Sequence, residues 1–571
     1  MKKITFLMGL LPFLALNAQS FEERETLMKD FYYSSGDIGD FDGDGFQDVV
    51  MNGAIDSDLN GNVDLTHNEI YRNNNGVLEL YGELGEYSTH LGDIRFFDFD
   101  NDGLLDIVST GLSYNDIVNY QHYRFQNTGS GFEAVQNTPG RIYSSIDVFD
   151  LNHDGFLDYA INGIQYVEGV GFTYDVELHK NIGNDFEMPT AWLPGTQGGG
   201  FKVLDVNNDG ELDVVVLGMN GSYDAVFQIY INNNGVLELN QEFPGMNTGD
   251  LAFADFNADG FLDLVAVGQD GEYDLKLNYY LNNGEGSFEV HTIEGEGLSG
   301  SSVDVGDLNN DGYYDFIIIG DDDNYDAYVK VFIYNPEEGN FSKFEDTGLY
   351  NLGSNGMIRL FDYNNDNHLD VLMSGFDWAD PDIPALNKLF ENISTEENQK
   401  PTPPTLLNLE QNGNRIHFSW EGANDDKTPT EALQYEIRVG TASGLGDIAK
   451  YKVTTPFWYL DLEEVPETIF WSVRSMDASK VYSEYSDENE LSNQELNIAG
   501  EFKLYPNPAK DIVYLKSDQK VDSVELFTLN GQRMKIEMRN DQINVSQLPK
   551  GIYVLKIQSG QCIVSKKLII Q

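Results

Sequence analysis

The sequence predicts an all-β protein, in which a seven-bladed β-propeller is followed by two smaller β-sandwiches. Three observations lead to this fold class. An acidic nine-residue motif recurs seven times, an apolar run that ends in glycine follows each copy, and the last third of the chain has stretches of alternating polar and apolar residues. Regular self-similarity with a period of about 50 residues is typical of propellers and other repeat folds.

The acidic motif has the form D-x-(D/N)-x-D-G-x-x-D, and its copies begin 50 to 58 residues apart. Oxygen-bearing side chains at alternating positions around a tight turn suit Ca²⁺, which takes six to eight oxygen ligands at about 2.3–2.6 Å. Glycine at position 6 permits the sharp turn. Asn367 replaces it in the seventh copy, and asparagine is the next best residue at positive φ. We therefore predict one calcium ion in each loop.

The expected ligands are the side chains at positions 1, 3, 5 and 9 and the backbone carbonyl of position 7, such as that of Phe46 in the first loop. The side chains are Asp40, Asp42, Asp44 and Asp48; Asp98, Asp100, Asp102 and Asp106; Asp150, Asn152, Asp154 and Asp158; Asp205, Asn207, Asp209 and Asp213; Asp255, Asn257, Asp259 and Asp263; Asp307, Asn309, Asp311 and Asp315; and Asp362, Asn364, Asp366 and Asp370. The alternative is a set of solvated acidic turns, which seven copies in register disfavour.

An eighth stretch has the same spacing and lies only 16 residues after the start of the first loop. Its side chains are Asp56, Asp58, Asn60 and Asp64. Because it follows the first repeat's apolar run, we expect it in a hairpin on the face opposite the seven loops. We predict a further metal site there, which could take a sugar hydroxyl or carboxylate directly. A lone acidic turn is the alternative.

Each repeat is interpreted as four strands, a to d, with the acidic motif between strands a and b. Strand b is a short apolar run that ends in glycine. These glycines are Gly53, Gly111, Gly163, Gly218, Gly268, Gly320 and Gly375. Strand c ends in an Asn/Gly turn, and strand d opens with Phe-Glu, as at Phe132, Phe186 and Phe288. Four-stranded units repeated around an axis form a propeller.

The ends of the repeat region predict how the ring closes. The seventh repeat stops after its strand c, near Leu389–Asn392, so it lacks strand d. The segment from Ser20 to Arg24 resembles the opening of strand d elsewhere. An unpaired strand edge would be exposed without it, so we expect residues 20–28 to complete the last blade.

These repeats resemble the FG-GAP or VCBS repeats of integrin α-subunit propellers and of many bacterial surface proteins. The resemblance extends over residues 19–394. It implies a seven-bladed propeller with Ca²⁺ in the a–b loops, and it implies little about the ligand, because this fold is a general scaffold.

The two ends of the chain predict export. Residues 1–18 form a secretory signal, with two lysines, an apolar run and a small residue before the expected cut. Residues 500–571 resemble the type IX secretion sorting domain of Bacteroidetes through Tyr505-Pro-Asn-Pro508, Leu548–Tyr553 and Lys566-Lys567. That family implies passage through the outer membrane by the type IX machinery, followed by removal of the domain. An ordinary adhesion module is the alternative.

A second sandwich is expected between these regions. Residues 395–404 are a proline-rich linker. Residues 405–495 contain alternating strands at 416–420, 435–439 and 470–477 and resemble a fibronectin type III domain, with Trp420 as its core tryptophan. We expect this domain to act as a spacer or to dock a partner.

The composition excludes some classes of partner. The formal net charge is −61, from 95 acidic and 34 basic residues, which argues against nucleic acid or anionic lipid. No stretch is apolar for the roughly 18 residues that a membrane span needs. The chain has one cysteine, Cys562, so calcium rather than disulfides is expected to stabilise the exported protein.

Aromatic residues recur at the expected b–c hairpins, on the face opposite the metal loops. They are Tyr114, Tyr166, Tyr174, Tyr223, Tyr273, Tyr325 and Trp378. Tyrosine and tryptophan give a large contact area with a polar tip, which suits sugar rings or a protein partner. We therefore predict a secreted or cell-surface calcium-binding module for glycan or protein ligands. Local packing of these rings over the hairpins is the alternative.

A catalytic role is the alternative function. His122 and His179 lie on strand c of the second and third repeats, beside Tyr123-Arg124 and Lys180. Such groups could abstract a proton in a calcium-dependent polysaccharide lyase or act in another glycan-degrading enzyme. An acidic protein is poorly suited to a polyanionic uronic-acid substrate, however, and histidine on a strand surface is the simpler interpretation. We therefore predict that the protein is not an enzyme.

Overall fold

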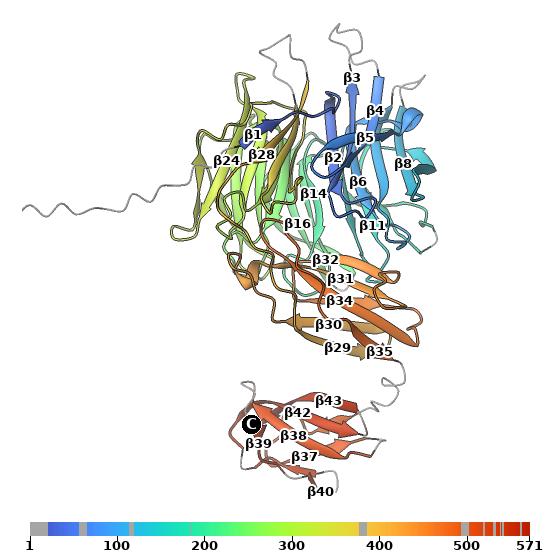
Figure 1. The fold of residues 1–571 in the computed structure, drawn as a ribbon, viewed down its shortest axis with the longest axis vertical. Coiled ribbons are helices and arrows are strands. Elements are labelled where there is room, and N and C mark those ends of the chain that lie inside the picture. The colour runs from blue at the N-terminus through green and yellow to red at the C-terminus, as the bar shows by residue number, and fades with distance from the viewer. Residues whose placement is uncertain are drawn as a thin grey trace, which may run out of the picture.

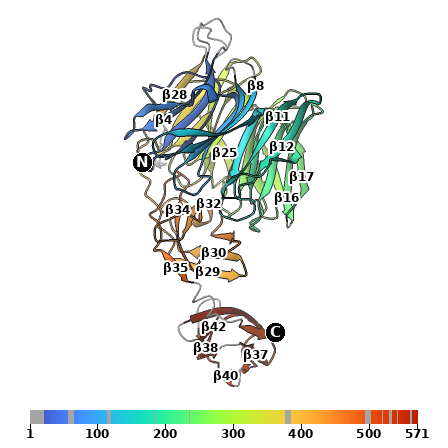
Figure 2. The ribbon, with the colours of Figure 1, turned by 90° about the vertical axis from the view of Figure 1, so that its right-hand side faces the viewer.

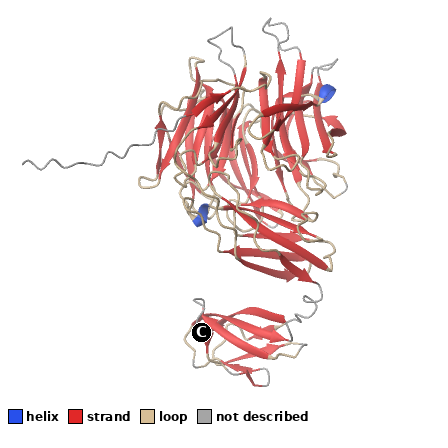
Figure 3. Cartoon of the chain, viewed as in Figure 1, coloured by secondary structure: helices blue, strands red, loops and turns tan. Residues whose placement is uncertain are grey.

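The computed structural model describes residues 21–55, 65–113, 119–183, 185–233, 235–375, 385–492, 502–517, 520–528, 533–536, 538–539, 542–546, 548–559 and 562–570. Within these ranges the only helical elements are two 3₁₀ turns, η1 (Gly85–Tyr87) and η2 (Thr430–Ala432), and all other regular structure is β-strand (Figure 3). The predicted all-β fold class is confirmed. The expected signal peptide lies outside the described residues.

The described residues between 21 and 392 form seven four-stranded antiparallel sheets arranged around an axis (Figures 1 and 2). The blades are β2 (Tyr32–Gly39), β3 (Asp48–Ile55), β4 (Leu65–Asn73) and β5 (Leu78–Glu83); β6 (His90–Phe97), β7 (Asp106–Ser113), β8 (Asn119–Asn127) and β9 (Phe132–Pro139); β10 (Ile142–Phe149), β11 (Asp158–Val167), β12 (Gly171–His179) and β13 (Thr190–Pro194); β14 (Phe201–Leu204), β15 (Asp213–Met219), β16 (Ala225–Asn233) and β17 (Val236–Pro244); β18 (Met246–Ala254), β19 (Asp263–Asp270), β20 (Leu275–Asn282) and β21 (Phe288–Thr292); β22 (Ser299–Gly306), β23 (Asp315–Asp321), β24 (Ala327–Asn335) and β25 (Asn340–Phe344); and β26 (Ile358–Phe361), β27 (Asp370–Gly375), β28 (Leu386–Asn392) and β1 (Phe21–Arg24).

The N-terminal strand closes the ring, as predicted. β1 pairs antiparallel with β28, with Phe21 opposite Asn392 and Arg24 opposite Leu389. Arg24 Nε lies 2.5 Å from a carboxylate oxygen of Glu391, and the Phe21 ring is buried in a core shared by blades 6 and 7. The first and last segments of the propeller therefore share one sheet, which removes an exposed strand edge.

Strand b ends at its glycine only in blade 7, at Gly375. In the other six blades the strand continues past the glycine, so the predicted strand end is wrong there, and the glycine instead has a packing role. A Cβ atom on Gly53 would lie 2.5 Å from the Cβ of Phe31, and one on Gly111 would lie 2.5 Å from the backbone oxygen of His90. In each case the segment that leads into strand a of the same blade crosses directly over the glycine. Only a residue without a side chain permits this approach.

The outer strand of blade 3 begins later than predicted. We expected it to open at Phe186, but β13 begins at Thr190, and Phe186 makes only an isolated bridge with Asn181. The Phe186 ring instead lies against the guanidinium of Arg124 in blade 2, 4.0 Å from the ring centre. Packing against the neighbouring blade therefore displaces the start of this strand.

Buried asparagines at the end of strand c tie neighbouring blades together. Asn127 Nδ2 donates to the Phe41 carbonyl of blade 1 at 3.0 Å and to the Leu105 carbonyl of its own blade at 3.1 Å. The same bridge to the preceding blade is made by Asn73, Asn181, Asn282 and Asn392. In blade 6 the corresponding residue is Tyr334. The sequence pattern identified these asparagines only as turn residues and did not predict that they bridge two blades.

Carboxylates on strand a make a second set of ties close to the axis. Asp37, Asp93, Asp147, Asp250 and Asp304 each accept the backbone N–H of a strand-a residue in the next blade, at 2.7–3.3 Å. Between blades 7 and 1 the earlier blade supplies the donor instead of the acceptor. Arg359 Nε of blade 7 donates to the Gly36 carbonyl of blade 1 at 2.9 Å. Adjacent blades are thus joined by charged hydrogen bonds at the axis as well as by apolar packing.

Two β-sandwiches follow the propeller. The first pairs the sheet of β29 (Leu406–Asn412), β30 (Arg415–Glu421) and β33 (Phe457–Asp461) with that of β32 (Ala449–Val453), β31 (Gln434–Gly440), β34 (Thr468–Met476) and β35 (Asn489–Ser492). Trp420 is buried in its core, as predicted. The second consists of β36 (Lys503–Tyr505), β37 (Ile512–Lys516), β41 (Gln542–Asn544) and β40 (Met538–Arg539) with β39 (Arg533–Met534), β38 (Ser523–Thr528), β42 (Gly551–Ser559) and β43 (Cys562–Ile570).

The asparagine bridge predicts a large stability difference between two similar substitutions. Asn127→Ala leaves the carbonyls of Phe41 and Leu105 without this donor, and each unsatisfied buried group costs about 1–3 kcal/mol. We expect the melting temperature of the propeller to fall by several degrees. Asn335→Ala in blade 6 is the matched control, because the Asn335 side chain only accepts from its own turn. Equal melting temperatures for the two variants would contradict the bridging role.

Candidate metal loops and the two faces of the propeller

The acidic motifs form seven tight loops between strands a and b. The side chain at position 1 organises each loop: in blade 2, Asp98 accepts the N–H of Asp102 at 3.2 Å and that of Gly103 at 2.9 Å. Position 6 is left-handed in all seven loops, with φ of 88–96° at the glycines and 67° at Asn367. The role assigned to position 6 from the sequence is therefore confirmed.

Position 4 of every loop is also left-handed, which the sequence analysis missed. Its residues are Gly43, Asn101, His153, Asn208, Ala258, Asn310 and Asn365, with φ of 54–75°. The signal was present, because five of the seven are asparagine or glycine, which tolerate this conformation. Two left-handed residues per loop turn the chain tightly enough to bring the acidic side chains together.

The last aspartate of each loop is fully buried and joins the loop to strand c. Asp48 accepts the N–H of Phe41 at 3.0 Å and that of Asn73 at 2.7 Å. The same two bonds recur at Asp106, Asp158, Asp213, Asp263, Asp315 and Asp370. Two accepted bonds leave further lone pairs on each carboxylate, so these residues can also serve as metal ligands.

The donor set of these loops fits a divalent cation. Oxygen atoms of Asp98, Asp100 and Asp106 all lie within 4.8 Å of one another, as do those of Asp40, Asp42 and Asp48 in blade 1. Burial, reinforced by the neighbouring carboxylates, raises the pKa of Asp98 to about 6 and that of Asp106 to about 8. The buried Oδ1 of Asp100 has no hydrogen-bond partner. A Ca²⁺ ion would neutralise this charge and use the free oxygen.

The loop of blade 1 differs from that of blade 2 because an arginine lies over it. Arg72 on β4 contacts Asp42 at 2.7 Å and Asp44 at 3.2 Å. In blade 2 the neutral Gln126 occupies the equivalent place and donates to Asp100 at 2.7 Å. The first loop therefore already has part of its charge balanced by the protein.

Three predicted features fall on residues that the structure does not describe. The predicted eighth metal site, at Asp56, Asp58, Asn60 and Asp64, lies in the undescribed range 56–64. Tyr114 and Trp378 lie in the undescribed ranges 114–118 and 376–384. Their roles stay predictions.

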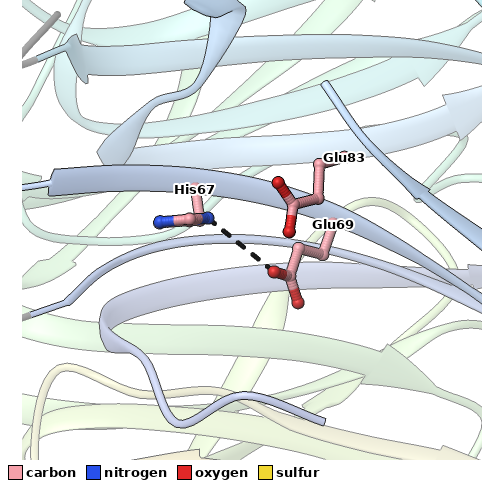
Figure 4. Close-up of side chains that lie close together, drawn as sticks. All are labelled: His67, Glu69 and Glu83. Atoms are coloured by element: carbon pink, nitrogen blue, oxygen red, sulfur yellow. Dashed lines mark ion pairs between the residues drawn. The ribbon is translucent and has the colours of Figure 1, made fainter. Parts of the chain in front are cut away.

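A further cluster of possible metal ligands occurs in blade 1, where His67, Glu69 and Glu83 lie close together (Figure 4). The Lys29 ammonium forms ion pairs with both glutamates. The buried Glu69 also accepts a hydrogen bond from Tyr71. An internal cation thus already balances the buried carboxylate, and the cluster is accounted for as an ion-pair network.

The two histidines considered for catalysis are buried where blades 2 and 3 meet. The ring of His122 contacts Thr138 Oγ1 and Tyr159 OH at 2.9 and 3.0 Å. The ring of His179 stacks on Tyr159 and contacts Glu177 at 2.9 Å. Burial lowers the pKa of both histidines. Their side chains fill the contact between blades and are almost completely buried, so the interpretation of these histidines as strand-surface residues is wrong.

The first sandwich lies against the metal-loop face of the propeller (Figures 1 and 2). Asn101 of the second loop donates to the Ile448 carbonyl at 2.8 Å, and the Asp461 N–H donates to the His153 carbonyl of the third loop at 2.6 Å. At blade 6, Ser479 contacts Asn310 at 2.9 Å, and Lys480 reaches Asp304 near the axis at 3.3 Å. The sandwich therefore covers loops of several blades.

The b–c hairpins are on the opposite, uncovered face. Tyr223, Tyr273 and Tyr325 stand at the tips of the hairpins of blades 4, 5 and 6, with 73%, 72% and 71% of their surface exposed. Tyr174 in blade 3 is only half-buried, and its ring lies against Gly221 of the next hairpin. Exposure on this scale argues against local packing for Tyr273 and Tyr325, whereas Tyr223 also forms a side-chain hydrogen bond with Tyr174 of the neighbouring hairpin.

The repeat pattern is recognised independently of the structure. The FG-GAP-like repeat family matches residues 40–109, 98–161, 205–266, 255–318 and 307–373, which together include all seven loops and about half of the chain. The chain is an FG-GAP repeat protein. Residues 503–571 match the secretion system C-terminal sorting domain. This FG-GAP protein is therefore exported by type IX secretion to the cell surface or the medium.

Solved structures show distant similarity to this FG-GAP protein. An α-L-arabinofuranosidase of Fusarium graminearum in complex with an iminosugar inhibitor aligns with 66% of this chain and 98% of its own, at 8% identity and a TM-score of 0.35. An α-L-arabinanase of Penicillium chrysogenum in complex with arabinobiose aligns with 66% and 97%, at 9% identity and a TM-score of 0.35. No curated protein sequence matches the chain. Among the described residues, no helix is long and apolar enough to span a membrane.

The loops predict that calcium stabilises the protein and that its effect grows with pH. Burial raises the pKa of Asp48 to about 7 and that of Asp263 to about 8, well above the ordinary 3.8. Without metal, the folded state therefore binds more protons than the unfolded state, and stability is lost as pH rises from about 4 to 8. We expect the melting temperature in chelator to fall over this range and millimolar calcium to restore it most strongly near pH 8.

Differential scanning calorimetry with and without calcium at pH 5.5 and 8 measures this effect. Asp100→Ala should reduce the calcium-induced shift, because it removes a ligand from one loop. Glu289→Ala is the control, since this carboxylate lies exposed on an outer strand. Identical melting curves in chelator and in calcium at both pH values would show that the loops do not bind the ion.

Proposed function

We propose that this exported FG-GAP propeller is a calcium-stabilised binding module that takes an extracellular glycan or protein ligand on its b–c hairpin face. The observation that carries this proposal is the division between the two faces. The sandwich contacts Asn101 and Asn310 of the metal loops, and its Lys480 reaches the propeller near the axis. The hairpin face exposes aromatic side chains.

Calcium has a structural role in this proposal. The carboxylates at positions 1, 5 and 9 of each loop would hold the ion, together with the Asp or Asn side chain at position 3 and the carbonyl of position 7. The bound cation would supply positive charge to loops that otherwise hold several buried carboxylates. Because the sandwich contacts these same loops, neutralising them would also preserve the surface on which it docks.

The exposed rings support a binding function. A tyrosine side chain that is more than 70% exposed contributes little to folding, but its flat face is available for a sugar ring or an apolar partner. The net charge of −61 disfavours polyanionic ligands. Neutral glycans and uncharged or basic protein surfaces are the ligand classes that remain.

The ligand class is tested by applying the labelled, full secreted chain to a glycan array in calcium. We expect signals on neutral oligosaccharides and weak signals on uronic-acid and sulfated glycans. Chelator should abolish binding by destabilising the propeller, so circular dichroism in the same buffers separates unfolding from loss of ligand contact. Absence of any glycan signal from folded protein would contradict the glycan form of the proposal. Cleavage of an array glycan would favour the enzymatic alternative.

Export is tested by deleting the sorting domain. Removing residues 503–571 should leave the protein in the periplasm, because the signal peptide alone directs it only through the inner membrane. Fractionation followed by immunoblotting measures this distribution. A second variant, with Lys566 and Lys567 both replaced by alanine, keeps the rest of the domain. It tests whether these two lysines are required for export. Normal surface or medium levels of the deleted protein would contradict the role of this domain.

A further inference from the structure

Three consecutive b–c hairpins have the same turn, and each presents a tyrosine at its tip. The turns are residues 220–224, 270–274 and 322–326, in blades 4, 5 and 6. In each turn the fourth residue is tyrosine, whose N–H donates to the carbonyl of the first residue at 3.0 Å. The side-chain oxygen of the first residue also accepts the N–H groups of the third and fifth residues, at 2.7–3.0 Å. The backbone of these turns is thus set without any contribution from the tyrosine ring.

The tyrosines occupy a backbone conformation that disfavours them. Tyr223, Tyr273 and Tyr325 have φ of 65°, 71° and 64°. A hairpin turn that ends in a left-handed residue normally has glycine or asparagine at this position, because a larger side chain is strained there. The side chains are more than 70% exposed, so burial compensates little of this strain, and only Tyr223 gains a side-chain hydrogen bond, with Tyr174. Strained residues retained without a packing reason point to function.

We infer that these three tyrosines, each followed by an exposed aspartate, form an arc that binds a chain of a neutral polysaccharide. The inference rests on the proposed binding function and names its site and ligand class. Asp224, Asp274 and Asp326 follow the tyrosines directly and are exposed. Each tyrosine ring can stack on the apolar face of a sugar, while the carboxylate beside it accepts hydrogen bonds from sugar hydroxyls.

The repetition of the site favours a polymer. The same ring and carboxylate recur on three adjacent blades, and a ligand built from repeating units can contact all three. Several weak contacts on one chain combine into a much higher affinity than any single one. Tyr174 lies against Gly221 at the blade-3 side of the first turn and extends the aromatic surface in that direction.

The charge of the three turns selects against other ligands. Every charged residue within 220–224, 270–274 and 322–326 is acidic, so uronic-acid and sulfated polymers are repelled. A basic peptide would bind through carboxylates that have no other cation beside them. In blade 5, however, Lys276 already forms ion pairs with Asp270 and Asp274, at 3.4 Å from each. A neutral sugar needs no net charge, and its hydroxyls can donate to a carboxylate that is already paired.

The test replaces the three tyrosines by glycine in the full secreted chain. Because glycine suits the left-handed position, we expect the melting temperature in calcium to stay unchanged or to rise. The probes are soluble arabinan, xylan, galactomannan and mixed-linkage glucan in affinity electrophoresis, followed by calorimetry on those that bind. Each single substitution should weaken binding about fivefold to tenfold, and the triple variant should lose it.

Two controls accompany these variants. Tyr→Phe at the same three positions keeps the ring and should retain most of the affinity. Tyr81→Ser removes a partly exposed tyrosine from the outer strand of blade 1, where its ring packs on Phe41, and should leave glycan binding unchanged.

Four results would overturn the inference. Full affinity of the triple glycine variant would place the glycan site elsewhere, with the proposed function intact. A clear drop in melting temperature would show that the tyrosines stabilise the fold. Binding of polygalacturonate or a lysine-rich peptide, without binding of a neutral polymer, would assign another ligand class. Failure of the wild-type protein to bind any of these probes would remove the glycan form of the proposed function as well.

Discussion

The structure of the propeller depends on one buried carboxylate in each blade, the last aspartate of the acidic loop. It accepts one N–H from the loop and one from strand c, so that a single side chain joins three consecutive segments of the blade. Removing a carboxylate from water is costly unless its charge is compensated. Burial raises the pKa of Asp106 and of Asp370 to about 8 although each carboxylate accepts two backbone hydrogen bonds. The same interaction that organises the blade therefore places a buried carboxylate where a bound cation, as proposed above, would compensate its charge.

Acidic residues also hold the blades to one another. Asp37, Asp147 and Asp304 accept backbone N–H groups across the blade boundaries near the axis. Arg95 forms an ion pair with Asp37, and Lys202 forms one with Asp147. The high acidic content of this chain is thus partly structural. Carboxylates bind backbone N–H groups more strongly than neutral acceptors do, and the radial arrangement of strands brings such groups together at five of the seven blade boundaries.

The division of the propeller into two faces separates the loops that organise the blades from the hairpins that we propose for binding. The face with the metal loops is covered by the first sandwich, and its loops are tied to strand c by buried bonds. The opposite face consists of hairpins whose local turns are self-sufficient, as the repeated bonds of Asn220, Asp270 and Asp322 show. Side chains at those tips can therefore vary or be used for binding without disturbing the blades.

The sequence by itself determined the seven blades, the loops, the closing strand and the sorting domain. These features are visible because each depends on local spacing: oxygen ligands at alternating positions, a glycine where two segments touch, and short apolar strands. Only the tertiary structure showed that Arg72 lies over the first loop, that Asn127 bridges two blades, that His122 is buried and that the sandwich covers the metal-loop face. Each of these depends on residues far apart in the chain, and the local sequence around them does not specify which distant group they meet. The exposed tyrosines combine both kinds of information, because their positions are evident in the repeats, while their strain and exposure follow from the folded hairpins.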